Sequence, residues 1–319
     1  MMLVWAIVGL LITSDKSAQN VLQKAEAHFY EGRLDISVKL LDSCLLKIDR
    51  TDKLTHARLL IKRGKMYAFQ SFTSNVGYEE ALASLFEARE LLDSTRDFRD
   101  EAEMHIWIGF TYYAMRFNRG EGDYDRPADY FQKALVLSRQ IGDARSEAEA
   151  IFYSGIIHER RQSADPMPFY RQAETLARKH GFKLELSYAT RHIAFLMQKE
   201  KKLDEALALF NESLKLREEI GFKIYLPFSY MSVGDVLVEM NRAQEALDYF
   251  DKAHRLADQL GSKRVVALSL LSLGDAHKTL KDRTRARQYF TEAKELSKAI
   301  QYKTGVDYAE KNLKELDTK

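Results

Sequence analysis

The chain has 319 residues, and its 49 Lys and Arg nearly balance its 47 Asp and Glu, which gives a net charge of +2. This balance argues against nucleic acid as a partner, because nucleic-acid binding relies on a strong positive field. The 4 Pro and 15 Gly are too few for an all-β protein, and the single cysteine, Cys44, excludes an intrachain disulfide and a multi-cysteine metal site.

The chain begins with ten consecutive apolar residues, from Leu3 to Ile12. This run is too short to span a bilayer as a helix, but it has the length of the apolar part of a secretory signal. No basic residue precedes it, and Lys16 stands where cleavage after Ala18 favours a small residue. We interpret residues 1–18 as a signal peptide or membrane anchor of an exported or membrane-tethered protein. The alternatives are a helix packed on the first repeat of a cytoplasmic protein, or an anchor shortened by a misassigned start.

A pattern with a period of about 40 residues fills the rest of the chain. In the second half of each unit, a small, a large and a small residue are separated by four and then three positions, as in Ala246, Phe250 and Ala253. Such residues share one face of a helix and let two helices approach closely. The first half of each unit carries one recurring small residue, namely Ala25, Gly64, Gly109, Gly155, Ala194, Gly234 and Gly274.

The ends of the units are marked by glycine. A glycine just past a helix can adopt the left-handed conformation that ends it. Gln301 replaces glycine at the last such position, where we expect the array to end. The pattern predicts seven helix pairs over residues 19–303 and a capping helix over residues 304–319. The glycines are Gly142, Gly181, Gly221 and Gly261.

Three units depart from the regular length or composition. The second and third units are longer, and we predict that their extra residues form loops between the paired helices, at 70–80 and 116–127. Such loops either carry binding elements or are simply tolerated on the surface. In the fourth unit, Pro166 and Pro168 are expected to begin a helix, because proline is accepted in a first helical turn.

The repeating frame resembles the tetratricopeptide repeat, in which a glycine of the first helix is followed by Ala, Phe and Ala of the second. Gly274, Ala286, Phe290 and Ala293 fit that frame. The initial Trp and the terminal Pro of the family are absent, and the period is longer than 34 residues. The resemblance implies an all-α fold, a right-handed α-solenoid of seven helix-turn-helix repeats with a C-terminal capping helix, whose first helices line the concave wall.

The resemblance also implies a groove on that wall for a protein or peptide partner. Each groove residue could instead pack between helices, and this alternative stays open. Arg191 is expected to be the one central cation. Asn is missing from the first-helix positions with which some members of the family bind a C-terminal carboxylate, so that mode is not expected. The groove residues are Ile106, Phe110, Tyr113, Phe152, Ile156, Glu159, Tyr188, Arg191, Phe195, Phe228, Met231 and Asp235.

No pattern in the sequence predicts catalysis, a cofactor or a metal. The histidines lack metal-ligand spacing, and His28, His158 and His277 recur at one repeat position, which indicates packing. Gly120 and Gly122 are not followed by the Lys and Ser or Thr of a phosphate-binding loop. We therefore expect a protein that is not an enzyme and takes no small-molecule substrate.

Three functions fit these observations to different degrees. We favour a scaffold that binds a protein or peptide in its groove. The alternative is a ligand-responsive signalling regulator that acts through a separate output partner. A repeat protein that binds RNA fits least, because Glu103, Glu149 and Asp235 would point into the groove and repel phosphate.

Overall fold

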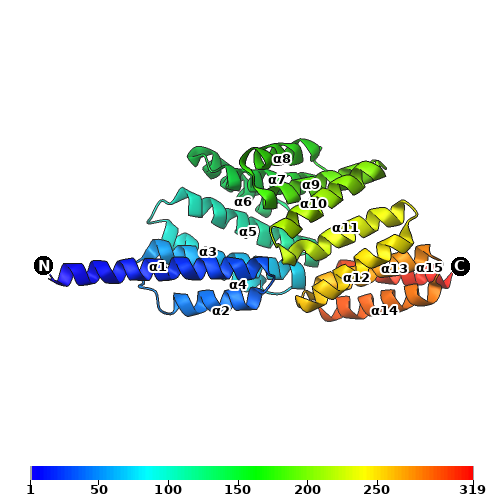
Figure 1. Cartoon of the computed structure of the whole chain (residues 1–319), viewed down its shortest axis with the longest axis horizontal. Helices are drawn as coiled ribbons and strands as arrows, with labels where there is room; N and C mark the ends of the chain where they lie inside the picture. Colours follow the sequence, from blue (N-terminus) through cyan, green and yellow to red (C-terminus); the bar gives the residue numbers. More distant parts are fainter. Residues whose placement is uncertain (1, 319) are drawn as a thin grey trace.

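The computed structural model describes the backbone of residues 2–318 and the side chains of residues 16–318. Residues 2–318 form fifteen α-helices and one short 3-10 helix, with no β-strand among them (Figure 1). The prediction of an all-α protein is confirmed.

Consecutive helices pack as seven pairs, and a last helix covers the seventh pair. Each pair corresponds to one predicted repeat, so the predicted solenoid is confirmed. The short helix η1 (Lys223–Tyr225) precedes the sixth pair. The pairs are α1 (Met2–Tyr30) with α2 (Leu34–Leu45), α3 (Lys53–Ser74) with α4 (Tyr78–Leu92), α5 (Phe98–Arg119) with α6 (Asp125–Ile141), α7 (Ala144–Arg161) with α8 (Met167–His180), α9 (Lys183–Lys199) with α10 (Leu203–Glu219), α11 (Leu226–Glu239) with α12 (Ala243–Gln259), and α13 (Lys263–Thr279) with α14 (Arg283–Ala299), and the last helix is α15 (Lys303–Asp317).

Within a pair, the small residue of the first helix faces the large residue of the second. A Cβ atom added to Gly234 would lie 2.3 Å from the Phe250 ring, and one added to Gly274 would lie 2.6 Å from the Phe290 ring. Phe250 and Phe290 are fully buried. The recurring small residues therefore allow the close approach that the sequence predicts.

The predicted glycine ends are also confirmed. Gly142 and Gly181 follow α6 and α8 with φ of 67° and 70°, in the left-handed region. Gln301 adopts the same conformation, with φ of 57°, before α15 begins. Pro166 and Pro168 lie at the start of α8, as expected for proline in a first turn.

The extra residues of the second and third repeats do not form the predicted loops. They lengthen the first helices, so that α3 continues to Ser74 and α5 to Arg119. The connections are short, 75–77 and 120–124. The prediction of loops at 70–80 and 116–127 is wrong because most of these residues are helical. The added turn of α3 is held by aromatic contacts with distant repeats, such as the stacking of Phe72 on Tyr225.

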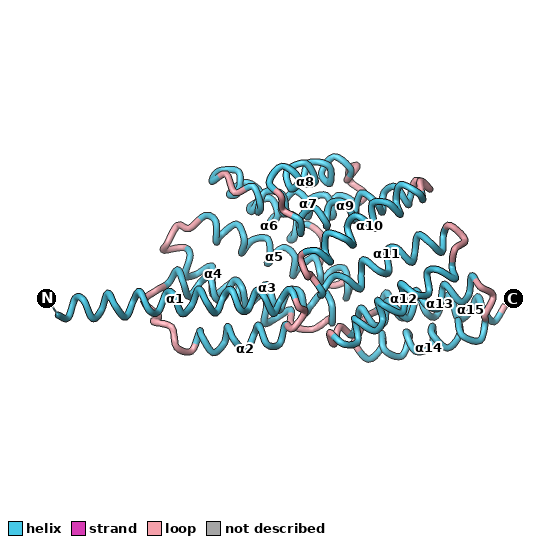
Figure 2. The backbone as a smooth tube through the Cα atoms, viewed as in Figure 1, coloured by secondary structure: helices cyan, strands magenta, loops and turns pink. Residues whose placement is uncertain are grey.

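The first helices lie side by side and form the inner wall of a superhelix, as the resemblance implies. Neighbouring contacts connect α1 to α3, α3 to α5, α5 to α7, and α7 to α9, and similar contacts connect α11 to α13 and α13 to α15. In Figure 2 the pairs follow one another along an arch, from α1 and α2 over α7 and α8 to α13 and α14.

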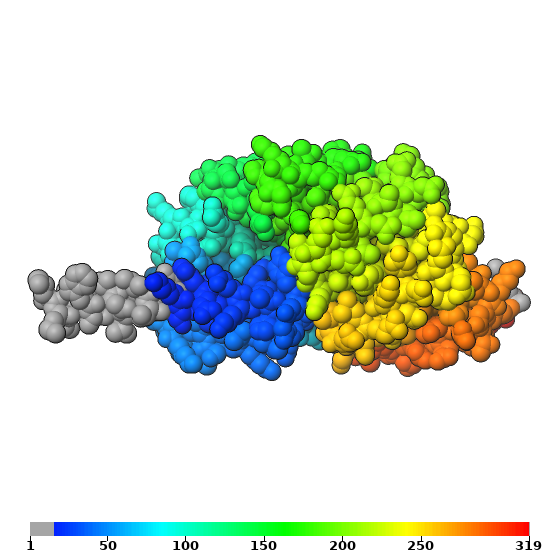
Figure 3. Space-filling view, in the orientation of Figure 1, coloured from blue at the N-terminus to red at the C-terminus, as the bar shows by residue number. Residues whose placement is uncertain are grey.

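The two ends of this arch meet. Helix α3 contacts α13, and α5 contacts α15, although these helices are far apart in the sequence. The Asn75 side chain donates a hydrogen bond to the Ile300 carbonyl (2.7 Å), and the Ser74 hydroxyl donates to the Gly261 carbonyl (3.3 Å). In Figure 3 the N-terminal repeats abut the C-terminal repeats. We call this region the closure contact, made by Phe72, Ser74 and Asn75 with Gly261, Arg264 and Ile300.

The chain therefore does not form an open rod, although regular repeats are compatible with one. Aromatic rings of distant repeats pack together across the interior. Phe72 stacks on Tyr225 with 6.2 Å between the ring centroids, and the ring centroids of Phe29 and Phe222 are 5.4 Å apart. Burial of these rings favours the closed form over an open one.

Helix α1 runs without a break through position 18, and Ala18 is buried. Most of the predicted signal or anchor lies outside the side chains that the structure describes, so its role stays a prediction. Among the described residues, no helix combines the length and the apolar character needed to cross a membrane.

Candidate functional site

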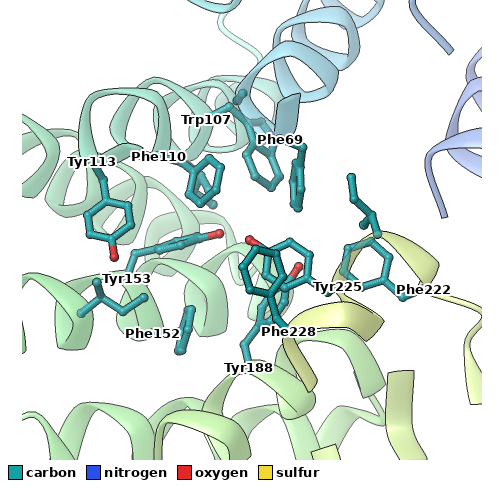
Figure 4. Close-up of a cluster of buried hydrophobic side chains, with 14 of the residues drawn as sticks. Phe69, Trp107, Phe110, Tyr113, Phe152, Tyr153, Tyr188, Phe222, Tyr225 and Phe228 are labelled. Carbon is teal, nitrogen blue, oxygen red and sulfur yellow. The ribbon is translucent and has the colours of Figure 1, made fainter. Parts of the chain in front are cut away.

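A cavity of about 240 Å³ lies inside the wall of first helices. Its lining comes from α3, α5, α7, α9, α11 and α13, together with Arg217 of α10, Tyr225 of η1 and Tyr302 before α15. Aromatic rings make much of this lining, and Figure 4 shows rings from several repeats pointing toward one another. We call this space the central cavity.

Most residues predicted for the groove line the central cavity. Ile106 and Met231 do not line it. Ile106 is fully buried and Met231 nearly so, because both pack in the hydrophobic core between neighbouring helices. Whether the remaining residues bind a ligand stays a prediction. The groove residues that line the cavity are Phe110, Tyr113, Phe152, Ile156, Tyr188, Arg191, Phe195 and Phe228.

Glu159 lies beside the central cavity but is already engaged by neighbours. The Tyr170 hydroxyl donates a hydrogen bond to its carboxylate (2.6 Å), and the His192 ring lies 3.6 Å away. Arg160 is 4.0 Å from the same carboxylate. Glu159 therefore holds neighbouring side chains in place instead of offering a free charge to the groove.

Four arginines line the central cavity, namely Arg160, Arg191, Arg217 and Arg264. The prediction that Arg191 is the one central cation is therefore wrong. Arg217 reaches inward from the second helix α10, and Arg264 lies in the first turn of α13. Neither position belongs to the repeat frame from which the groove was predicted.

Arg217 is held by hydroxyl groups and rings. Its exposed fraction is 1%. It donates to the Ser187 hydroxyl (3.1 Å) and to the Ser229 hydroxyl (2.7 Å). Its guanidinium lies over the Tyr188 and Tyr225 rings, 5.5 and 5.2 Å from their centroids. Burial lowers the pKa of Arg217 to about 10, so the surroundings do not fully compensate its charge.

Arg264 joins the central cavity to the closure contact. It is also 1% exposed, and its Nε donates to the Phe72 carbonyl. Its guanidinium lies 4.5 Å from the centroid of the Phe72 ring and 5.7 Å from that of Phe228. Its Nη2 atom is buried without a hydrogen-bond partner.

Arg191 of α9 also lines the central cavity. It donates to the Ser232 hydroxyl (3.0 Å), and its guanidinium lies 4.5 Å from the Phe195 ring centroid. Burial, followed by repulsion from Arg217, lowers its pKa to about 9. No Asp or Glu is among the described residues that line the central cavity.

A second, larger cavity of about 800 Å³ adjoins the central cavity, because Phe195, Leu268 and Tyr302 line both. We call it the acidic cavity, since its lining includes Asp235, Glu239 and Asp275. Lys278 is the one lysine of this lining, and its ammonium group donates hydrogen bonds to Asn312 and Glu315 of α15.

Asp235, which was predicted for the groove, thus lies in the adjoining acidic cavity. The Ser272 hydroxyl donates to it at 3.2 Å. Burial, followed by repulsion from Asp275, raises the pKa of Asp235 to about 7. Nearby Arg191 lowers the pKa of Asp235 but does not outweigh burial and the repulsion between the two carboxyl groups.

A third cavity, of about 400 Å³, lies on the side of the N-terminal repeats and shares Tyr188 with the central cavity. Its charges are mostly paired: Lys62 lies 2.7 Å from Glu103, and Lys65 lies 2.9 Å from Glu26. This mixed-charge cavity therefore attracts an ionic ligand less than the central cavity does.

Within residues 16–318, no three His, Cys, Asp or Glu side chains come together as ligands for a metal ion. His158 stacks on Phe169 (4.6 Å) and His277 on Tyr289 (5.4 Å), which confirms that these histidines are packing residues. The arrangement provides apolar contact and positive charge in a confined space, the features of a binding cavity.

The model of the tetratricopeptide repeat family matches residues 185–259 and 225–299. These two overlapping matches cover the fifth to seventh helix pairs, and the preceding pairs have the same architecture. The resemblance to the tetratricopeptide repeat is thereby confirmed for residues 185–299. No curated protein sequence matches the chain.

Several solved structures share this fold. A Rap protein in complex with competence and sporulation factor has 12% identity and a TM-score of 0.55, and the match covers 95% of this chain and 98% of the Rap chain. The apo form of the quorum sensor NprR from B. thuringiensis has 12% identity and a TM-score of 0.52, and the match covers 99% of this chain and 93% of the NprR chain. NprR in complex with its cognate peptide NprX has 13% identity and a TM-score of 0.55, and the match covers 79% of this chain and 71% of the NprR chain.

Sequence reasoning missed Arg160, Arg217 and Arg264. Arg264 precedes the small residue Gly274 by ten positions, and Arg99 and Arg145 stand at the corresponding position of two other repeats. That shared position was a usable signal, because Arg99 and Arg145 line the mixed-charge cavity. Nothing in the repeat frame indicated that a second-helix residue such as Arg217 would reach the interior.

Proposed function

We propose that this protein is a receptor that binds a peptide inside its superhelix and is not an enzyme. The observation that carries the proposal is the central cavity, where aromatic residues of five first helices converge around the arginines of its lining. Apolar rings with a few fixed polar groups are typical of a site that binds a ligand in a defined orientation. Such a site is largely preformed, so little binding free energy is lost in ordering it.

Two of the structures with this fold support a peptide as the ligand. NprR was solved with its cognate peptide and the Rap protein with competence and sporulation factor. Those ligands belong to those proteins. At 12–13% identity the likeness supports only a shared architecture, and the class of ligand for this chain is our proposal.

A ligand-responsive regulator is the second candidate function, and the closure contact favours it. Phe72 and Arg264 belong both to that contact and to the lining of the central cavity. A ligand in the cavity would therefore touch residues that join the second repeat to the seventh. Binding would shift the balance between closed and open superhelix only if the ligand prefers one of them. The regulated partner would be a separate protein.

The receptor proposal is tested by filling the passage between the central and acidic cavities. The purified chain is incubated with an equimolar pool of pentapeptides, and retained peptides are identified by mass spectrometry after gel filtration. We expect the wild-type chain to retain a subset of the pool, and Leu268→Trp, which lies between the two cavities, to reduce retention at least about tenfold.

Leu280→Trp provides the matched control, because Leu280 is 38% exposed just past α13, the helix that contains Leu268. It should retain the same peptides as the wild-type chain. Equal retention by the Leu268→Trp chain, with its melting temperature unchanged, would show that peptides bind elsewhere and would end the proposal.

A further inference from the structure

The central cavity holds more positive charge than the protein around it compensates. Among the described residues, no carboxylate forms an ion pair with Arg191, Arg217 or Arg264, whose polar contacts are hydroxyl groups and backbone carbonyls. Three buried polar atoms of the lining also lack hydrogen-bond partners, namely Nη2 of Arg264, the hydroxyl oxygen of Tyr188 and Nδ1 of His192.

This arrangement is costly for the protein unless an anion joins it. Placing a cation in a low-dielectric interior is unfavourable, and a hydrogen-bonded counter-ion of good geometry offsets much of that cost. Aromatic faces offset only part of it. A carboxylate is the natural counter-ion, because the planar guanidinium group matches it with two parallel hydrogen bonds.

The adjoining cavity carries the opposite charge. Asp235 and Asp275 both line it and repel each other, and its one lysine, Lys278, also donates to Asn312 and Glu315 of α15. The two cavities meet at Phe195, Leu268 and Tyr302, so a ligand can extend from one into the other. A ligand that fits both has an anionic end beside apolar groups and a cationic end a short distance away.

The size of the cavities points in the same direction. The central cavity, at about 240 Å³, is small for a whole ligand, since ligand pockets usually enclose about 300–1,000 Å³. It accommodates the end of a ligand, and the acidic cavity of about 800 Å³ accommodates the rest. A short peptide with free ends has both charges in these positions, whereas a small organic acid has only one.

We propose that the ligand is a short peptide bound with its C-terminus inward, so that its free carboxylate pairs with Arg191, Arg217 and Arg264. These arginines differ from the first-helix Asn, absent here, with which some tetratricopeptide repeat proteins bind a C-terminal carboxylate. Its last side chain is apolar and lies among the rings of the central cavity. Its N-terminal ammonium group lies beside Asp235 and Asp275 in the acidic cavity. This inference rests on the proposed receptor function and specifies the chemistry and direction of the ligand.

The test compares four probes on the full-length chain. They are a pool of pentapeptides ending in Phe with both ends free, the same pool amidated at the C-terminus, the same pool acetylated at the N-terminus, and N-acetylphenylalanine alone. We expect amidation to lower retention at least about tenfold, and acetylation to lower it several-fold. N-acetylphenylalanine should bind much more weakly than the free pool.

Each other outcome has a defined meaning. Equal retention of the amidated and free pools would overturn the carboxylate inference and leave the receptor function standing. Equal binding of N-acetylphenylalanine and the free pool would replace the peptide by a small organic acid. A chain that retains neither pool would contradict the receptor function itself, together with the inference that rests on it.

A variant pair assigns the effect to the cavity. Arg191→Gln keeps a polar side chain at this partly buried position but removes the charge. We expect it to bind the free pool about tenfold more weakly and to lose most of the preference for free over amidated peptides. Arg171→Gln, at an exposed arginine of the second helix α8, serves as the control and should keep both affinity and preference. An Arg191→Gln chain that folds normally and keeps its preference would overturn the assignment.

Discussion

Glu103 and Glu149 occupy the same position of successive repeats, six residues before the small residue of the first helix, yet their surroundings act in opposite directions. Burial raises the pKa of Glu103, but Lys62 and Lys65 outweigh it and lower the pKa to about 2. For Glu149, burial and then Glu185 raise the pKa to about 8, with Lys65 and Arg145 too weak to reverse this. A repeat position therefore fixes where a side chain points, while its charge state depends on residues from other repeats.

The stability of the fold should depend on pH through Glu149. Its folded pKa of about 8 lies above its ordinary value, so the folded chain retains a proton that the unfolded chain releases. The free energy of unfolding therefore falls as the pH rises from about 4.5 to about 8. Glu149→Gln should remove this fall and add on the order of 1–3 kcal/mol at pH 8.5, with little effect at pH 4. Urea denaturation at both pH values measures the difference.

Glu103→Gln is the matched control for this experiment. The pKa of Glu103 is lowered on folding, so its stabilising contribution is present above about pH 4.5 and is lost as the pH falls toward 2. The variant should therefore lose stability at pH 8.5, the opposite of Glu149→Gln. Changes of the same sign in both variants would contradict the assigned surroundings.

At the scale of elements, the helix pairs were predictable because a single periodic contact defines them. The small residues and their large partners lie on one face of each helix, and this pattern is visible in the sequence. The length of α3 and α5 was not predictable in the same way. Whether residues 70–74 continue a helix depends on Phe72 stacking against Tyr225, and the sequence does not show a contact across 153 positions.

The contact within a pair can be tested at Gly234. A methyl group there would lie 2.3 Å from the Phe250 ring, so the two helices must separate slightly. Ala194 fills the same position of the fifth repeat, which shows that a pair can adjust and limits the cost. We expect Gly234→Ala to lower the free energy of unfolding by about 1–2 kcal/mol in urea titrations. Phe250→Leu should offset part of this loss when the two changes are combined, and strictly additive losses would argue against the contact.

For the whole molecule, the number of repeats and the inner wall could be predicted, but the closed shape could not. Regular repeats specify contacts between neighbours, and these are compatible with an open array. Closure depends on single residues at a distance, such as Asn75, which is 1% exposed and binds the Ile300 carbonyl. The position of Arg264 in the central cavity also depends on closure, because its Nε donates to the Phe72 carbonyl of a distant repeat.

Asn75→Gly tests the closure contact. Asn75 has φ of 63°, so glycine keeps the backbone conformation and removes only the amide side chain. We expect a loss of about 1–3 kcal/mol in the free energy of unfolding and a larger radius of gyration by small-angle X-ray scattering. Gln162→Gly is the matched control, since Gln162 also ends a helix in the left-handed region but is exposed. An unchanged scattering curve for Asn75→Gly would also remove the support for a regulatory role.

A linear array of repeats can fray from either end, because each unit depends only on its neighbours. In this molecule the second and seventh repeats hold each other, so neither terminus is a free edge. Loss of the last helix pair would remove the hydrogen bonds between Arg264 and Phe72 and between Asn75 and Ile300, and would loosen the opposite end of the chain. The protein should accordingly unfold in one cooperative transition, as a globular domain does, although it is built from repeats.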